Sequence, residues 1–149
     1  MTIRDSVISG NQATNGGGIG NTPATATGFV TMQVTVENSS ITGNMVSGNG
    51  VQTGNGGGIA SLDGMLMVIN STISGNTAAG TAGAGSVSGL GGAMLVGSQA
   101  LPNNVTLVAN TIANNTAVTG ASGIAHASLG GATTAQFKNN ITAMWVSTA

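Results

Sequence analysis

A five-residue phrase built around one isoleucine recurs along this chain at nearly regular intervals. It reads VISGN at residues 7–11, SITGN at 40–44, TISGN at 72–76 and TIANN at 111–115, and Asn140-Ile141-Thr142 opens a further copy. When Ile8, Ile41, Ile73, Ile112 and Ile141 are aligned in one column, the steps between them are 33, 32, 39 and 29 residues. Repeats of this length are typical of solenoids and repeat arrays rather than of an ordinary globular core.

Each repeat contains three strand-like pieces. The isoleucine phrase alternates polar and apolar residues, as in Ser40-Ile41-Thr42, which is the pattern of a half-buried strand. A glycine cluster follows, ending in Ile19, Ile59 and Met94 in three copies and in Thr133 in the copy that we assign to residues 130–133. The third piece is the most apolar, at residues 30–36, 65–69, 105–108 and 135–137, and it is followed by Asn38, Asn70, Asn110 and Asn140.

Three short strands per period, corners rich in glycine and asparagine, and no helical periodicity predict an all-β parallel β-helix, also called a β-solenoid. We expect a single domain over residues 1–149, with repeats that start near residues 7, 40, 72, 111 and 140. It should form about four to five coils of three short strands, with loop insertions at the corners. The five aligned isoleucines should face the interior as one ladder, and Ile19, Ile59 and Met94 as another.

One asparagine closes every complete isoleucine phrase, at Asn11, Asn44, Asn76 and Asn115. Asparagine tolerates the left-handed backbone of tight corners and can hydrogen-bond its own neighbours. Stacked asparagines can also exchange amide hydrogen bonds between coils as a ladder. The sequence leaves both roles open.

The glycine clusters and the apolar pieces together resemble a known family. Residues 16–19, 56–59 and 91–94 are similar to the Gly-Gly-Ala repeat that ends in an aliphatic residue, and Phe137-Lys138-Asn139-Asn140 is similar to the Phe-x-x-Asn repeat, of the polymorphic outer-membrane proteins. Equivalent segments at 67–70 and 107–110 carry aliphatic residues in place of phenylalanine. The resemblance implies a right-handed winding, as does the general crossover preference, but such motifs specify a coil shape and not an activity.

Charged residues are too few and too scattered for most kinds of chemistry. They make up 3% of the chain and give a net charge of −1, so no basic surface for nucleic acid is expected. Arg4, Asp5, Glu37, Asp63 and Lys138, with His126, offer no paired carboxylates and no set of metal ligands in sequence, and there is no cysteine. We therefore predict no enzyme activity, no cofactor, no metal site and no membrane span.

The two ends of the predicted solenoid carry no polar cap, although open ends present unpaired strand edges and apolar side chains. Residues that we expect to form an assembly interface are Ile3, Val7, Ile141, Met144, Trp145 and Val146. Trp145, the single tryptophan, is either an anchor in that interface or a local plug over the last coil. The sequence thus favours an extracellular or cell-surface structural subunit that stacks head to tail with copies of itself. The alternative is a segment of a larger cell-surface adhesin or autotransporter-like passenger, with cell-surface glycans or other surface proteins as partners.

Two further surface roles are compatible with the composition. Ser40 and Thr42, Thr72 and Ser74, and Thr111 would form a partly regular hydroxyl face similar to that of ice-binding solenoids, although a solvated strand also carries hydroxyls. Glycosylation acceptor patterns occur at Asn38, Asn70, Asn104, Asn114 and Asn140.

Overall fold

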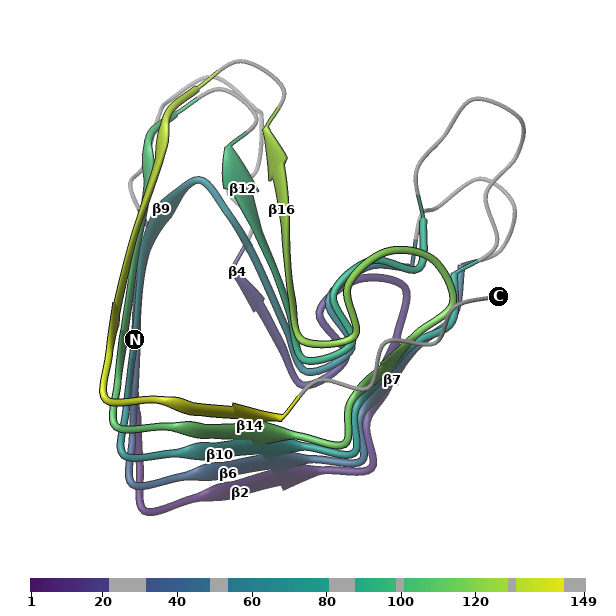
Figure 1. The fold of residues 1–149 in the computed structure, drawn as a ribbon, viewed down its shortest axis with the longest axis horizontal. Helices are drawn as coiled ribbons and strands as arrows, with labels where there is room; N and C mark the ends of the chain where they lie inside the picture. Colours follow the sequence, from purple (N-terminus) through teal and green to yellow (C-terminus); the bar gives the residue numbers. More distant parts are fainter. Residues whose placement is uncertain (22–31, 49–53, 81–87, 99–100, 129–130, 144–149) are drawn as a thin grey trace.

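The chain forms a β-solenoid with no helix in the part that the structure describes (Figure 1). A computed structural model describes residues 1–21, 32–48, 54–80, 88–98, 101–128 and 131–143. Within these ranges, eighteen short strands pair only in parallel, and they stack into four sheets, which we name A to D in the order in which the chain enters them. The all-β parallel solenoid predicted from the repeat is therefore confirmed.

Sheets A and B each contain five strands. Sheet A consists of β1 (Thr2–Arg4), β5 (Gln33–Glu37), β9 (Gly64–Ile69), β13 (Asn103–Val108) and β17 (Thr133–Lys138). Sheet B consists of β2 (Val7–Ser9), β6 (Ser40–Thr42), β10 (Thr72–Ser74), β14 (Thr111–Ala113) and β18 (Ile141–Ala143). In each sheet the strand order in space follows the chain from the N-terminal to the C-terminal end.

Sheets C and D each contain four strands. Sheet C consists of β3 (Gln12–Ala13), β7 (Met45–Val46), β11 (Thr77–Ala78) and β15 (Thr116–Ala117). Sheet D consists of β4 (Ile19–Asn21), β8 (Ile59–Leu62), β12 (Met94–Ser98) and β16 (Ile124–Ser128). Each complete coil thus has four strands, and the expectation of three was wrong because the strands of sheet C are only two residues long.

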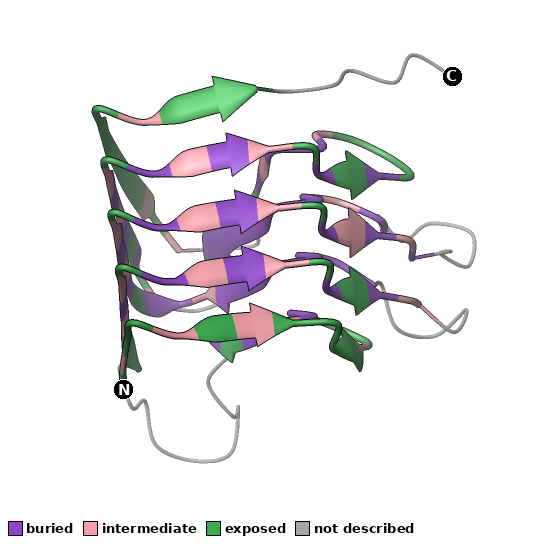
Figure 2. Cartoon of the chain, turned by 90° about the horizontal axis from the view of Figure 1, so that it is seen from below, coloured by how far each residue is buried: buried purple, intermediate pink, exposed green. Residues whose placement is uncertain are grey.

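The winding is right-handed. In Figure 1 the chain passes anticlockwise from sheet A through B and C to D while it moves toward the viewer, and Figure 2 shows the first and last strands of sheet B at opposite ends of the stack. In the described residues the chain passes four times through all four sheets, from β1–β4 to β13–β16, which makes four coils. In the described residues, β17 and β18 begin a further pass through sheets A and B only.

Inward side chains of consecutive coils lie above one another and form the core. Ile8, Ile41, Ile73 and Ile112 pair in register through sheet B, and Ile41 and Ile73 are fully buried. Sheet D contributes a second predicted column, Ile19, Ile59 and Met94, which continues in Ile124. Sheet A closes the core with buried valines and leucines from β5, β9 and β13.

Ile141 does not continue the isoleucine column, so that part of the prediction was wrong. Thr142 is the residue in register with Ile112, whereas Ile141 pairs with Thr111 on the outer face and is 68% exposed. The corner before it explains the shift. Asn139 has the same left-handed backbone as Ala109, with φ of 55° and 56°, so the strand that follows begins one residue later than the alignment of isoleucines assumed.

The glycine clusters cross the inner side of sheet C, where only hydrogen atoms fit. A Cβ on the second glycine of each cluster would overlap a carbonyl oxygen of the next coil: that of Gly57 for Gly17, Gly92 for Gly57 and Thr116 for Gly92. The fourth cluster is not residues 130–133 as predicted, because Ile124 pairs with Met94 and Gly123 accepts the N–H of Met94 at 3.1 Å. Thr133 instead pairs with Asn103 in sheet A.

Candidate functional site: the ends of the solenoid

The charged side chains are spread over several coils of the solenoid. No set of three or more His, Cys, Asp or Glu side chains that could hold a metal ion occurs in the described ranges. The Nε of Arg4 lies 2.7 Å from a carboxylate oxygen of Glu37 in the next coil, on the outer face of sheet A. Asp63 is buried in a left-handed turn between sheets D and A. In the residues that the structure describes, no helix is long and apolar enough to cross a membrane.

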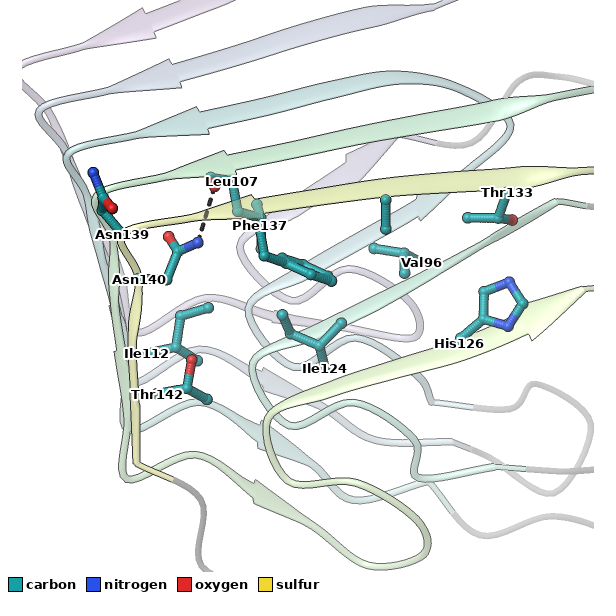
Figure 3. Close-up of a pocket in the computed structure, with 11 residues that line it drawn as sticks. Val96, Leu107, Ile112, Ile124, His126, Thr133, Phe137, Asn139, Asn140 and Thr142 are labelled. Carbon is teal, nitrogen blue, oxygen red and sulfur yellow. Dashed lines mark hydrogen bonds between the residues drawn. The ribbon is translucent and has the colours of Figure 1, made fainter.

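The C-terminal end of the stack contains a hollow of about 790 Å³ (Figure 3). It lies against β17 and β18 and over β16, where the described chain has no further strand of sheets C and D. Its apolar wall includes Val96, Leu107, Ile112, Ile124 and Phe137. His126, in β16, and Thr133 also line it.

Among the described residues, Phe137 is the largest side chain left uncovered at this end. It pairs in register with Leu107, which pairs with Val68, so Phe137 occupies the inward column of sheet A. Leu107 and Val68 are fully buried, whereas Phe137 is 56% exposed because no strand follows β17 in sheet A among the described residues. Its ring points into the hollow beside Ile124 (Figure 3). Sequence analysis matched Phe137 to a repeat motif but did not include it in the interface.

The predicted interface residues fall into three groups. Ile3 is half-buried in the inward column of sheet A, at the N-terminal end. Val7 and Ile141 point outward from the first and last strands of sheet B, and Val7 is 72% exposed. Met144, Trp145 and Val146 lie outside the described residues. The structure therefore places Ile3 and Phe137, not Ile3 and Ile141, on the same inward column at opposite ends.

An asparagine ladder runs along the corner between sheets B and C, which confirms one of the two roles left open by the sequence. The Nδ2 of Asn11, Asn44 and Asn76 donates to Oδ1 of the next asparagine, ending at Asn115, at 3.0 Å in each case. The backbone N–H of each donor residue bonds to the same Oδ1 at 3.0 to 3.1 Å. The other Nδ2 hydrogen of Asn44 bonds to the carbonyl oxygen of Ile8 at 3.0 Å, so the polar groups of an inner rung are fully used.

A second, mixed ladder runs along the corner between sheets A and B. Its members are Ser6, Ser39, Ser71, Asn110 and Asn140. Each backbone N–H donates to the side-chain oxygen of the next member, at 3.2, 3.1, 2.9 and 2.9 Å along the series. The Nδ2 of Asn110 adds a bond of 3.0 Å to Oδ1 of Asn140, so asparagine makes a stronger rung than serine here.

Both ladders have a direction, because the donor always belongs to the coil nearer the N-terminus. At the N-terminal end, Asn11 Oδ1 and Ser6 Oγ receive no N–H from the described residues. At the C-terminal end, the backbone N–H groups of Asn115 and Asn140 donate to none of them. One end of the solenoid therefore presents ladder acceptors, and the other presents ladder donors.

The structure also separates the five glycosylation acceptor patterns. Asn38, Asn70, Asn104 and Asn114 are exposed. Asn140 is half-buried, its Oδ1 accepts two bonds from Asn110, and its Nδ2 donates to the carbonyl oxygen of Leu107 at 2.9 Å. A glycan on Asn140 is thus incompatible with the ladder, whereas the other four positions have room for one.

Comparisons with protein-family models, with curated proteins and with solved structures return no match to this chain. The resemblance to the polymorphic outer-membrane protein repeats therefore stays a prediction.

Proposed function

We propose that this protein is a non-enzymatic structural subunit of an extracellular fibre or surface layer, which assembles by stacking the C-terminal end of one copy on the N-terminal end of the next. The observation that carries the proposal is the exposure of Phe137 on a column that is otherwise buried. An uncovered apolar column beside an unpaired strand edge favours association with another β-structure. A second copy offers Ile3 at the matching position of β1.

Stacking in register would extend two sheets across the junction. Strand β1 of the next copy would follow β17, and its β2 would follow β18, since the strand order of sheets A and B has these strands at opposite edges. The contact would bring Lys138 next to Arg4 of the next copy, because both belong to the column that contains Glu37. Arg4 and Lys138 are both positively charged, and the pairing of Arg4 with Glu37 offsets only part of their repulsion. Added salt should screen the remaining repulsion and strengthen the junction.

Electron microscopy and sedimentation of the purified chain test the proposal. We expect fibres with an axial repeat of roughly 24 Å, because each copy adds the five stacked strands of sheets A and B. Phe137→Asp should abolish them, because it places a charge on the column to be buried. Met65→Asp is the matched control: Met65 is 40% exposed on the outer face of sheet A, away from both ends, and the substitution should leave fibres intact.

Particles that stay monomeric at high concentration, or fibres that survive Phe137→Asp, would contradict the proposal. A parent chain that continues with further coils would cover the same column covalently. That outcome would favour the second reading, a segment of a larger cell-surface adhesin.

A second candidate function rests on the outer face of sheet B. Ser40, Thr72 and Thr111 lie in one column, and Thr42 and Ser74 lie in the next, on three consecutive strands. Strand spacing of about 4.8 Å makes this a small regular array of hydroxyl groups, as in ice-binding solenoids. A thermal-hysteresis assay tests it: activity that is lost in Thr72→Val would support ice binding, and no hysteresis in the native chain would exclude it.

A further inference from the structure

The two side-chain ladders give the solenoid a polarity that its sheets lack. In a parallel sheet each strand edge offers both N–H and C=O groups, so a strand edge alone does not specify which partner edge it takes. The ladders differ, because in each bond from one ladder member to the next the donor lies in the coil nearer the N-terminus and the acceptor is the side-chain oxygen of the following member. The other Nδ2 hydrogen of an inner asparagine donates to a backbone carbonyl of the preceding coil. An end that carries only ladder acceptors cannot complete its rungs with another end of the same kind.

We propose that the ladder on the corner between sheets A and B selects the partner at the junction: the free donors of Asn140 bind Ser6 Oγ of a second copy. This inference rests on the proposed assembly function and adds the groups that fix its direction and register. The model for the contact is the last rung within the chain, where Asn110 donates its N–H at 2.9 Å and its Nδ2 at 3.0 Å to Asn140. Asn140 offers the next set, its backbone N–H and its second Nδ2 hydrogen.

The partner identified by this chemistry is the N-terminal end of another copy. Ser6 stands in the same column as Asn140, four coils apart, and its Oγ lies at the edge of the stack. Two C-terminal ends brought together would face donors with donors, and two N-terminal ends would face acceptors with acceptors. Buried polar groups without partners are costly, so such contacts are disfavoured relative to the unlike pair.

Engineered cysteines test the polarity directly, because the chain has no cysteine of its own. Thr2 and Gln136 belong to one outer column of sheet A, in its first and last strands, and both are exposed. Ser9 and Ala143 are the equivalent exposed pair in sheet B. Neighbouring residues of adjacent strands lie about 4.8 Å apart, within the range that a disulfide spans. Mixtures of single variants should therefore form mixed dimers under oxidation, namely Thr2→Cys with Gln136→Cys and Ser9→Cys with Ala143→Cys.

The crossed mixtures are matched controls. Thr2→Cys with Ala143→Cys and Ser9→Cys with Gln136→Cys join different sheets and should link no faster than free thiols. Dimers formed by Gln136→Cys alone or Thr2→Cys alone would show contact between like ends. Like-end dimers would overturn the polarity and leave self-assembly standing, whereas no linkage in any mixture would overturn both.

Substitutions at Ser6 test the ladder itself. Ser6→Asn should raise the rate of mixed-dimer formation about fivefold, because asparagine accepts both donors as Asn140 does within the chain. Ser6→Ala should lower it by a similar factor, since Asn140 then has no acceptor at the junction. Ser9→Ala, on the outer face of sheet B in the same coil, should change neither the linkage rate nor the fold. Equal rates for Ser6→Asn, Ser6→Ala and the native chain would overturn the role of this ladder.

Discussion

The inner coils and the last strands of this solenoid are built on the same columns but differ completely in burial. Leu107 in β13 is fully buried and Phe137 in β17 is 56% exposed, although they are neighbours in one column. Ile112 in β14 is 1% exposed, whereas Thr142 in β18 is exposed (Figure 2). A residue in a solenoid is therefore buried by the coil next to it, not by its own strand. Stability should follow the number of neighbouring coils, and the ends should be where function depends on a partner.

The strongest way to break the contact between two coils is to place an atom between them. A Cβ on Gly57 would overlap the carbonyl oxygen of Gly92 and lie 2.6 Å from the carbonyl carbon of Thr77, and neither backbone can move freely. Gly57→Ala should lower the free energy of unfolding by about 3 kcal/mol or more, or prevent folding. Urea unfolding followed by circular dichroism measures this.

Gly43 in the same coil provides the control. Its φ of 61° matches that of Asn114 at 56° on the same corner, and a Cβ on it would meet nothing within 4 Å. Gly43→Asn should therefore stay within about 0.5 kcal/mol of the native chain. Equal losses from the two substitutions would show that the close approach at Gly57 does not limit stability.

Removing the same kind of side chain from an inner and a terminal coil should give unequal losses. Ile73 is fully buried between Ile41 and Ile112, so Ile73→Ala should cost about 3 kcal/mol through lost contacts and a cavity. Phe137→Ala removes a larger side chain but should cost less than about 1 kcal/mol in dilute solution, because Phe137 has one neighbouring coil only. Both losses of unfolding free energy are to be measured by urea unfolding at a protein concentration below that at which copies assemble.

The dependence of these two losses on protein concentration tests whether the C-terminal end contacts a second copy. If the C-terminal end is covered by a second copy, the loss from Phe137→Ala should grow with protein concentration, while the loss from Ile73→Ala should stay constant. A concentration-independent value for Phe137→Ala would mean that this end is not a contact between copies.

The features that recur in every repeat could be predicted from the sequence. The features that depend on the register between coils could not. One inward isoleucine per phrase and an invariant step from it to Asn11, Asn44 and Asn76 predicted the column and made the ladder one of two possible roles for these asparagines. Sheet C was missed because two residues per strand give no periodicity. The last coil was shifted by one residue because Asn139 and Asn140 are adjacent, and only the backbone shows that Asn139 takes the left-handed corner. Residues 121–124 were missed as the fourth glycine segment because Gly131 offered a closer match to the motif.

Asparagine rungs should repeat the contrast between inner and terminal coils on a smaller scale. Asn76 is fully buried, and its Oδ1 accepts the N–H and Nδ2 of Asn44, so Asn76→Ala leaves buried donors without partners and should cost about 2 kcal/mol. The side chain of Asn11 only donates within the described chain and the residue is exposed, so Asn11→Ala should cost about 0.5 to 1 kcal/mol. Similar losses at the two rungs, measured by urea unfolding, would mean that an inner rung of the ladder stabilises the fold no more than a terminal rung does.

The smallest effect should come from the ion pair that joins the first coil to the second. The Nε of Arg4 lies 2.7 Å from Oε2 of Glu37, but the side chains are 64% and 26% exposed, so solvent screens the attraction. Glu37→Gln should therefore change the free energy of unfolding by less than about 0.5 kcal/mol, and salt should reduce even that difference. Glu37→Gln should weaken assembly more than folding. Without Glu37, Arg4 is unpaired, and stacking brings Arg4 beside Lys138 of the next copy. If fewer Glu37→Gln fibres sediment at low salt while the free energy of unfolding is unchanged, the ion pair acts on the junction between copies and not on the fold. A large loss of stability would instead show that the terminal coil depends on this ion pair and not on its contact with the second coil.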